Sequence, residues 1–207
     1  MKRWLFISYI LLCINLYLSS QTINKETLIT RINERAASIK TLESRFIQTK
    51  HISLLKDVMI SEGVMYYDKS NKLRWEYLTP YTYCFILNDT KVLLASSTKK
   101  DVIDIKNNQM FQEIAKIMMN SITGKCLSGS SDFNVEIEHV SNKTNAILYP
   151  KKKTLKQLFS KIILHFNFDY TMIETVELFE KSGDKTEIKL TQPKLNHSIN
   201  ESVFILN

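Results

Sequence analysis

Glycine is scarce in this chain, with four residues among 207. The glycine-rich patterns that hold nucleotide phosphates, GxGxxG and GxxxxGK, are absent from the sequence, and so is the GxSxG turn that presents the nucleophile of many hydrolases. These absences exclude nucleotide binding and serine hydrolysis in their usual forms. No other motif places a nucleophile beside a base, so we expect a protein that is not an enzyme.

Cysteine and histidine are scarce as well, and their spacing does not fit a metal site. The four histidines are isolated, without a second histidine or an acidic residue at ligand spacing such as HxxxH. Cys84 and Cys126 do not form a CxxC motif. We therefore expect no metal and no cofactor. The sequence allows a disulfide between Cys84 and Cys126 in an oxidising compartment and does not decide whether it forms. A free thiol is the ordinary state of a buried cysteine such as Cys84.

The first twenty residues (1–20) have the layout of a secretory signal peptide. Lys2 and Arg3 are basic, Trp4–Leu18 is an apolar run, and a pair of small serines follows. The alternative is a retained membrane anchor, but a run of about 15 residues is short for a bilayer core, which needs about 20. We predict cleavage near Ser20, export from the cytoplasm, and a single domain over residues 21–207.

Charge and length narrow the possible partners. The formal net charge is +7, and removal of Lys2 and Arg3 leaves +5. An exported protein seldom meets nucleic acid, so we expect no nucleic-acid partner. The basic balance points instead to anionic surfaces such as lipid headgroups or to acidic partners. The remaining length is enough for one domain with a substantial core, and we expect a monomer.

The strongest secondary-structure signal lies in the stretch Gly63–Phe85. Apolar residues fill both of its arms, and a polar turn at 68–71 divides them. In the second arm, Trp75 and Tyr77 alternate with polar neighbours, which is the period-2 spacing of a strand. We therefore predict a β-hairpin. Gly63 lies inside its first strand, where glycine commonly marks a bulge or a bend.

Strand patterns continue through most of the chain and are joined by short turns, as in an antiparallel meander. A helix over 23–39 precedes the strands, and a second helix over 107–121 interrupts them. The predicted strands are 42–52, 58–67, 72–78, 81–87, 91–96, 133–139, 145–149, 158–168, 172–181 and 185–192. About ten strands and two helices in one domain predict an α+β fold that is mainly antiparallel β.

The predicted helix 107–121 is rich in methionine. Met110, Phe111, Ile114 and Met118 recur at helical spacing. Most such stripes are ordinary core. Methionine, however, is unbranched and polarizable, and it is over-used at surfaces that bind varied apolar partners. We interpret this helix as a lid over an apolar cavity.

Several segments together resemble the LolA-type periplasmic lipoprotein carriers. Phe46 and Gln48 form an F-x-Q motif, a glycine-led strand begins at Gly63, and residues 74–80 match R-W-x-Y-x-x-P. The closing residues 196–204 fit N-x-x-I-x-x-x-x-F. The resemblance spans nearly all of the chain that follows the predicted signal peptide.

The resemblance implies a half-open, unclosed β-barrel with an α-helical lid on its concave face. Its apolar cavity would take the acyl chains of lipoproteins from an inner-membrane lipoprotein-release ABC transporter and deliver them to an outer-membrane acceptor. Lys69 and Arg74 are expected to bond the backbone of the lid or polar groups of the cargo. The residues expected to contact lipid are Phe46, Tyr66, Trp75, Tyr77, Phe85, Leu87, Met110, Phe111, Ile114 and Met118.

Other functions fit the same residues. One is an envelope lipid-sensing or regulatory interaction domain on the same half-barrel scaffold. Another is a carrier of a different lipid, because the turn at 68–71 lacks the basic–proline pair of the best-known carriers. An exported hydrolase of apolar substrates is disfavoured because its nucleophile motif is missing.

Overall fold

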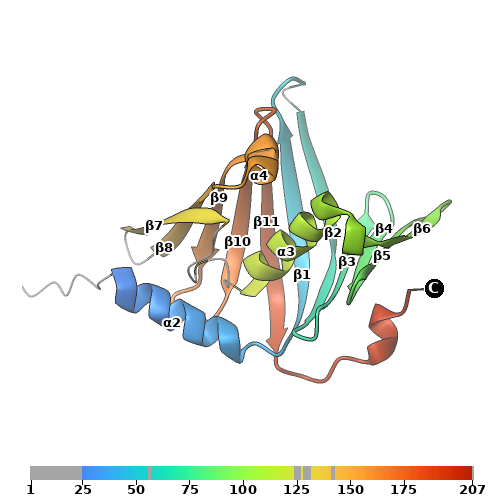
Figure 1. Ribbon diagram of the computed structural model, residues 1–207, viewed down its shortest axis with the longest axis horizontal. Coiled ribbons are helices and arrows are strands. Elements are labelled where there is room, and N and C mark those ends of the chain that lie inside the picture. Colours follow the sequence, from blue (N-terminus) through green and yellow to red (C-terminus); the bar gives the residue numbers. More distant parts are fainter. Residues whose placement is uncertain (1–24, 56, 124–126, 128–131, 141–142, 207) are drawn as a thin grey trace, which may run out of the picture.

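The computed structural model describes residues 25–55, 57–123, 127, 132–140 and 143–206 (Figure 1). Its helices are α2 (Lys25–Ser38), α3 (Gln109–Thr123) and α4 (Lys153–Leu158), with short 3₁₀ helices η1 (Ile105–Asn107) and η3 (Glu201–Phe204). Its strands are β1 (Thr41–Ile52), β2 (Asp57–Asp68), β3 (Lys72–Thr79), β4 (Tyr83–Asn88), β5 (Lys91–Ser96), β6 (Lys100–Asp104), β7 (Phe133–Val140), β8 (Lys143–Pro150), β9 (Phe159–Phe166), β10 (Ile173–Glu180) and β11 (Lys185–Leu195).

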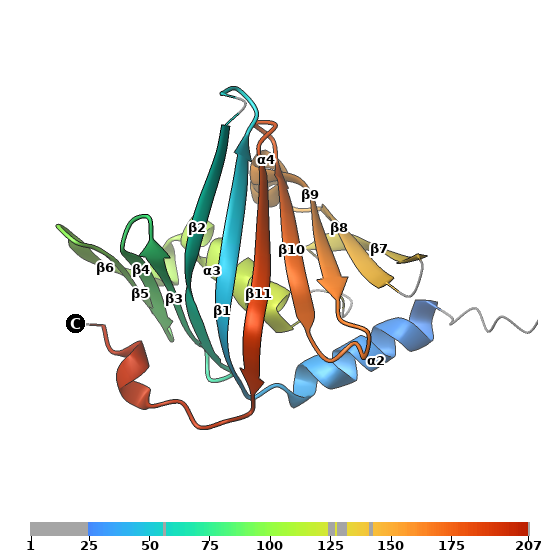
Figure 2. The same cartoon turned by 180° about the vertical axis from the view of Figure 1, so that it is seen from behind.

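All eleven strands belong to one antiparallel sheet, in the order β6-β5-β4-β3-β2-β1-β11-β10-β9-β8-β7. The two halves of the chain meet where β1 pairs with β11, so that Phe46 lies opposite Leu190. The sheet curls without closing, and β6 and β7 are its two edges (Figures 1 and 2). The predicted α+β fold and its half-open barrel are therefore confirmed.

A bulge in the sheet lies at Gly63, as the sequence predicts. The register between β2 and β3 shifts between Glu62 and Gly63, where Gly63 faces Tyr77 of β3 and Phe46 of β1. A bulge bends its strand and increases the local twist. It thus contributes to the curvature of the N-terminal half of the sheet.

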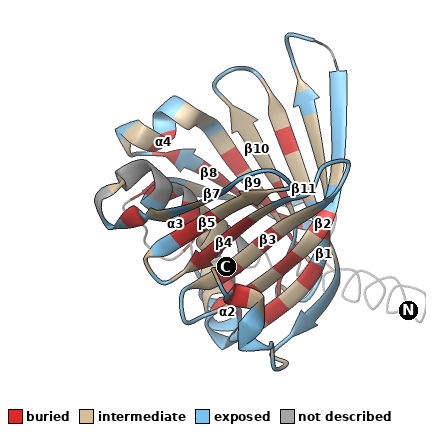
Figure 3. Cartoon of the chain, turned by 90° about the vertical axis from the view of Figure 1, so that its right-hand side faces the viewer, coloured by how far each residue is buried: buried red, intermediate tan, exposed pale blue. Residues whose placement is uncertain are grey.

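The concave face of the sheet is covered by helices. Helix α3 crosses it, and α2 packs on its C-terminal half, where Leu28 and Ile32 join a buried cluster with residues of β8, β9 and β10 (Figure 1). Burial is concentrated in the middle of the strands, and the far end of the β1–β2 hairpin is exposed (Figure 3). The face beneath α3 is therefore the place where an enclosed site can form.

Three short elements differ from the sequence-based prediction. Strand β6 was not predicted, because this edge strand has a charged K-D-V-I-D sequence and exposes Val102. Helix α4 lies between the predicted strands 145–149 and 158–168, where no helix was predicted, since only Leu155 of its residues is buried and the apolar signal is weak. The closing segment, for which no element was predicted, contains the 3₁₀ helix η3, whose Phe204 is buried.

The predicted signal peptide and Cys126 lie outside the described residues. So do two residues whose types suit helix ends, Asn24 near the start of the first predicted helix and Gly124 after the second. Cys84 is a free thiol, and burial raises its pKa to about 11. None of the helices in the described part of the chain is long and apolar enough to cross a membrane.

Candidate functional site

Three aromatic rings pack together on the concave face of the N-terminal half. Phe46 of β1 stacks on Trp75 of β3 with ring centroids 4.1 Å apart, and it meets Tyr77 edge-on at 5.2 Å. Trp75 lies directly opposite Met65 in β2 and Phe85 in β4. Cross-strand pairs of this kind stabilise a sheet, and here they make an apolar wall from β1 to β4.

An apolar cavity of about 240 Å³, the central cavity, lies between this wall and helix α3. Ile117 and Met118 of α3 cover it, and strands β9, β10 and β11 form its opposite wall. The site therefore sits where the two halves of the sheet face each other. The lining residues are Gln48, Trp75, Tyr77, Ile117, Met118, Phe159, Val176, Leu178, Ile188 and Leu190.

Two polar side chains, Gln48 and Tyr77, bond each other in this cavity. The Tyr77 hydroxyl donates a hydrogen bond to Gln48 Oε1 over 2.8 Å. Burial raises the pKa of the Tyr77 phenol, and its hydrogen bonds only partly offset that effect. The phenol is therefore neutral at physiological pH, and the cavity carries no charge on its lining residues.

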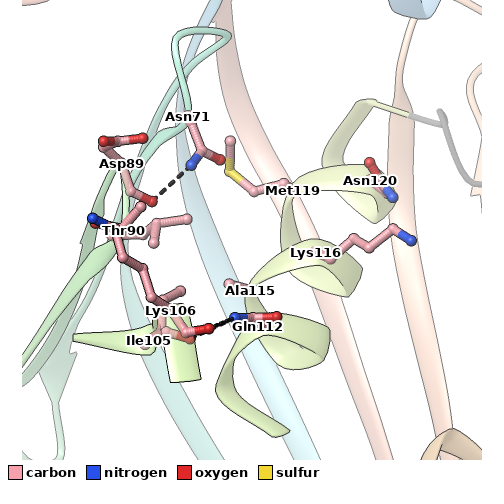
Figure 4. A pocket seen from close by; sticks show the side chains of 11 residues that line it. Asn71, Asp89, Thr90, Ile105, Lys106, Gln112, Ala115, Lys116, Met119 and Asn120 are labelled. Atoms are coloured by element: carbon pink, nitrogen blue, oxygen red, sulfur yellow. Dashed lines mark hydrogen bonds between the residues drawn. The ribbon is translucent and has the colours of Figure 1, made fainter. Parts of the chain in front are cut away.

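A second cavity, of about 410 Å³, lies beside α3 and is more polar (Figure 4). It opens between α3 and the turns that join β2 to β3 and β4 to β5, where Asn71 Nδ2 donates to the carbonyl of Asp89 over 2.7 Å. Gln112 Nε2 donates to the Ile105 and Lys106 carbonyls at 2.7 and 2.6 Å. These bonds hold the first turns of α3 against η1.

An ion network joins α3 to the C-terminal half of the sheet. Lys152 Nζ lies 2.8 Å from Asp132 Oδ1 and 2.7 Å from Glu113 Oε1 of α3, and Lys116 of α3 also bonds Asp132. The Asp132 side chain is only 4% exposed. Burial alone would raise the pKa of Asp132, but the two lysines outweigh it and lower this pKa to about 2. Asp132 is therefore ionised at neutral pH and fastens the helix.

Replacing Asp132 with asparagine is expected to loosen α3. The folded-state pKa is below the ordinary value of 3.8, so the stabilisation is present above about pH 4 and is lost as pH falls through about 2. Hydrogen exchange of the α3 amides at pH 7 should be about tenfold faster in the variant. The exposed Lys99–Asp101 pair on β6 provides a control, because Asp101→Asn should leave α3 exchange unchanged. Equal α3 exchange in Asp132→Asn and the unchanged protein would contradict the role of the network.

Several of the residues predicted from the sequence meet at the central cavity. Trp75, Tyr77 and Met118 line it, and Phe46 packs behind Trp75. Phe85 and Leu87 are buried in the same cluster beside it. The helix predicted to carry Met110, Phe111 and Ile114 is present as α3, but the side chains of these three lie outside the described residues.

Two predicted roles, lipid contact by Tyr66 and a lid or cargo contact by Arg74, are wrong, because both side chains lie on the face of the sheet away from the cavity. They are direct cross-strand partners and alternate with Trp75, which puts both on the convex side. Arg74 bonds Glu76 Oε2 over 2.9 Å and donates from Nη1 to the Val203 carbonyl over 3.1 Å. It therefore holds the C-terminal segment and not the lid.

Lys69, the other predicted latch, is exposed in the turn between β2 and β3. Its backbone N–H donates to the Lys40 carbonyl over 2.8 Å. In the same turn it is Asn71 that lines the cavity beside α3 (Figure 4). The ion network at Asp132 fastens α3 instead.

The sequence did not lead us to predict the cavity residues that come from the C-terminal half of the chain. Val176 and Leu178 share one face of β10, and Ile188 and Leu190 share one face of β11. A period-2 reading of segments 172–181 and 185–192 would have picked out both pairs as an apolar face. Phe159, at the start of β9, had no comparable signal.

Comparison with known proteins places this geometry in a family. The family model described as outer membrane lipoprotein carrier protein LolA matches residues 37–207. No curated protein matches the chain. A solved structure of an uncharacterized conserved protein from Thermus thermophilus is similar with a TM-score of 0.52 and 9% identity, covering 87% of this chain and 93% of that one.

Two further solved structures share the fold. A DUF1329 family protein from Desulfovibrio piger gives a TM-score of 0.50 at 12% identity, covering 86% of this chain and 94% of that one. MucB gives a TM-score of 0.50 at 12% identity over 90% of this chain, which corresponds to 64% of the MucB chain. At such identities the likeness concerns the fold alone, whereas the family model covers most of the sequence. The chain therefore belongs to the LolA family of outer membrane lipoprotein carrier proteins.

Proposed function

We propose that this protein carries lipoproteins by holding their acyl chains in the central cavity beneath α3. The observation that supports this most is the lining of the cavity, in which eight of the ten side chains are apolar and the other two, Gln48 and Tyr77, bond each other. Such a surface suits a hydrocarbon chain, because it offers no charge that would lose its solvation.

The energy of binding follows from the size of acyl chains. Each CH₂ group removed from water contributes about 0.8 kcal/mol, so a lipid anchor cannot cross an aqueous compartment exposed. A carrier needs an apolar surface that shields the chain and can still open. Met118 of α3 is partly buried and lines the central cavity, and a flexible methionine side chain accommodates acyl chains of different shape.

The rest of the proposal concerns the place and direction of transfer. Export through the signal peptide at residues 1–20 would bring the protein to the periplasm, as a monomer. There it would receive cargo from an inner-membrane lipoprotein-release ABC transporter and release it to an outer-membrane acceptor. The chain has no nucleotide motif of its own, so direction would come from the relative affinities of the two partners.

Purification from the periplasm tests this function directly. The full-length chain is expressed in a bacterium with two membranes, purified from the periplasmic extract, and examined by native mass spectrometry and lipid extraction. The expected result is lipoprotein, or its acyl chains, in stoichiometric amount. A protein that is empty and retains a protein partner would instead favour the regulatory interaction domain. A stoichiometric lipid without peptide would favour a carrier of another lipid.

A further inference from the structure

The end of the β1–β2 hairpin extends beyond the rest of the sheet, beside the β10–β11 hairpin (Figures 1 and 2). Its five large apolar side chains are all exposed, with Leu54 reaching 91%. We call these residues the hairpin tip, and they are Leu54, Leu55, Val58, Met59 and Ile60. Monomeric proteins seldom gather large apolar side chains at one exposed place without a function.

The hairpin tip is held in a defined position. The two strands pair without interruption out to Ile52 and Asp57. Beyond them the Ser53 N–H donates to Asp184 Oδ1 in the neighbouring β10–β11 turn over 3.0 Å. The exposed leucines are thus presented by a braced hairpin.

The apolar residues of the tip point in more than one direction. Val58, Met59 and Ile60 are consecutive in β2, and successive side chains of a strand point to opposite faces. All three are exposed, so β2 carries apolar side chains on both of its faces at this end of the hairpin, opposite Thr49, Lys50 and His51 of β1. A groove in a partner protein would cover one face, whereas the interfacial region of a bilayer surrounds an inserted tip on all sides.

The charges behind the tip are mixed, and it is the net charge of the chain that favours an anionic bilayer. Lys50 Nζ lies 3.1 Å from Glu180 and 3.7 Å from Asp184, so this one lysine offsets one of the two carboxylate charges. Asp57, in the turn itself, accepts the Val58 N–H with Oδ1 over 2.8 Å. Lys181 is exposed in the adjacent turn. After removal of Lys2 and Arg3 with the signal peptide the formal net charge is still +5, so the chain as a whole is attracted to anionic headgroups.

The tip also lies at one end of the surface that forms the central cavity. Gln48 lines that cavity, and Lys50 and Ile52 follow it on the same face of β1. Lys50 lies four residues before Leu54, which is at most about 13 Å along an extended chain. Interfacial elements enter a bilayer by about 5–10 Å, so Lys50 can stay outside the apolar region when the tip is inserted. An acyl chain that leaves the cavity along this face would reach the tip.

From these observations we propose that the hairpin tip inserts into the surface of an anionic lipid bilayer, and that it positions the mouth of the central cavity at the membrane. The second part rests on the proposed carrier function. The first part depends only on the exposed tip and the positive net charge of the chain, so the two can fail separately.

Vesicle binding tests the tip. Protein purified from the periplasm is floated with vesicles of phosphatidylglycerol and phosphatidylethanolamine, and the bound fraction is titrated against lipid. The double variant Leu54→Asp/Leu55→Asp removes two leucine side chains from the lipid. Each loss should weaken vesicle binding about tenfold, so the double variant should bind about 100-fold more weakly. Phe168→Asp is the matched control, since Phe168 is 76% exposed in the turn after β9 at the opposite end of the sheet, and it should bind like the unchanged protein.

The outcomes separate the proposals. Unchanged vesicle binding in the double variant would overturn membrane insertion, as would an equal loss in Phe168→Asp. A dimer that the double variant disrupts on a sizing column would assign the tip to a second copy of this chain and would also overturn it. Binding of a fluorescent long-chain fatty acid is measured in parallel. If the unchanged protein binds vesicles through the tip but binds no fatty acid, the proposed carrier function is contradicted, whereas membrane insertion of the tip is supported.

Discussion

Replacing Ile188 with aspartate is expected to weaken binding of a fluorescent long-chain fatty acid by about 100-fold or more, because an unpaired carboxylate cannot be buried against hydrocarbon without a large loss of solvation. Ile188 lies in the middle of β11 and lines the central cavity. It packs against the core clusters of both halves of the sheet. A charge there would affect every chain that occupies the site.

The same substitution should leave the fold intact. Ile188 is only partly buried, since the cavity beside it leaves one side of the residue open. In the empty protein the carboxylate can be solvated through that opening. Thermal unfolding should therefore change little, and loss of fatty acid binding can be separated from loss of structure.

Thr175→Asp supplies the matched control for Ile188→Asp. Thr175 lies on the neighbouring strand β10, one rung away, and it pairs with Lys189 on the convex face. The variant adds the same charge to the other side of the same sheet, so fatty acid affinity should stay within about twofold of the unchanged protein. If both variants lost binding equally, net charge rather than the cavity would explain the effect. If neither lost binding, the lipid would not occupy this cavity.

Local periodicity predicted part of the N-terminal wall of this site. The alternation in residues 72–78 correctly put Trp75 and Tyr77 on one face and Arg74 on the other. Tyr66 was misplaced because its face depends on the register between β2 and β3. That register shifts at Gly63, and the sequence alone does not give the pairing of Tyr66 with Arg74.

The other wall depends on contacts between distant parts of the chain. Phe46 meets Leu190 only because the first strand pairs with the last, and no local pattern specifies that pairing. The packing of the C-terminal segment on the sheet is a second example of a contact between distant parts of the chain. After β11 the chain passes to the convex face, where Phe204 is buried and Asn88 Nδ2 donates to its carbonyl over 3.2 Å. Arg74 therefore has a structural partner that its neighbours in sequence do not reveal.

Replacing Gly63 with alanine is expected to destabilise the protein by about 3 kcal/mol, or about 6–12 °C in Tm. A Cβ atom at this position would lie 2.0 Å from the Glu76 carbonyl oxygen and 2.4 Å from Cζ of Phe46. The first of these is a backbone atom, so the adjacent strand β3 would have to move. Urea titration and thermal unfolding followed by circular dichroism would measure the loss.

The effect of Gly63→Ala should extend to the cavity, which distinguishes it from an ordinary loss of stability. The Phe46 ring occupies the space above Gly63 and stacks on Trp75, which lines the cavity. A displaced ring would move Trp75 and change its fluorescence. Gly183→Ala is the control: this turn residue has φ 93° and its nearest neighbour, Ser53 Oγ, is 3.4 Å from the added Cβ, so the substitution should cost about 1 kcal/mol through backbone strain alone. Equal losses in the two variants, or unchanged tryptophan emission in Gly63→Ala, would show that the close approach of β3 does not shape the site.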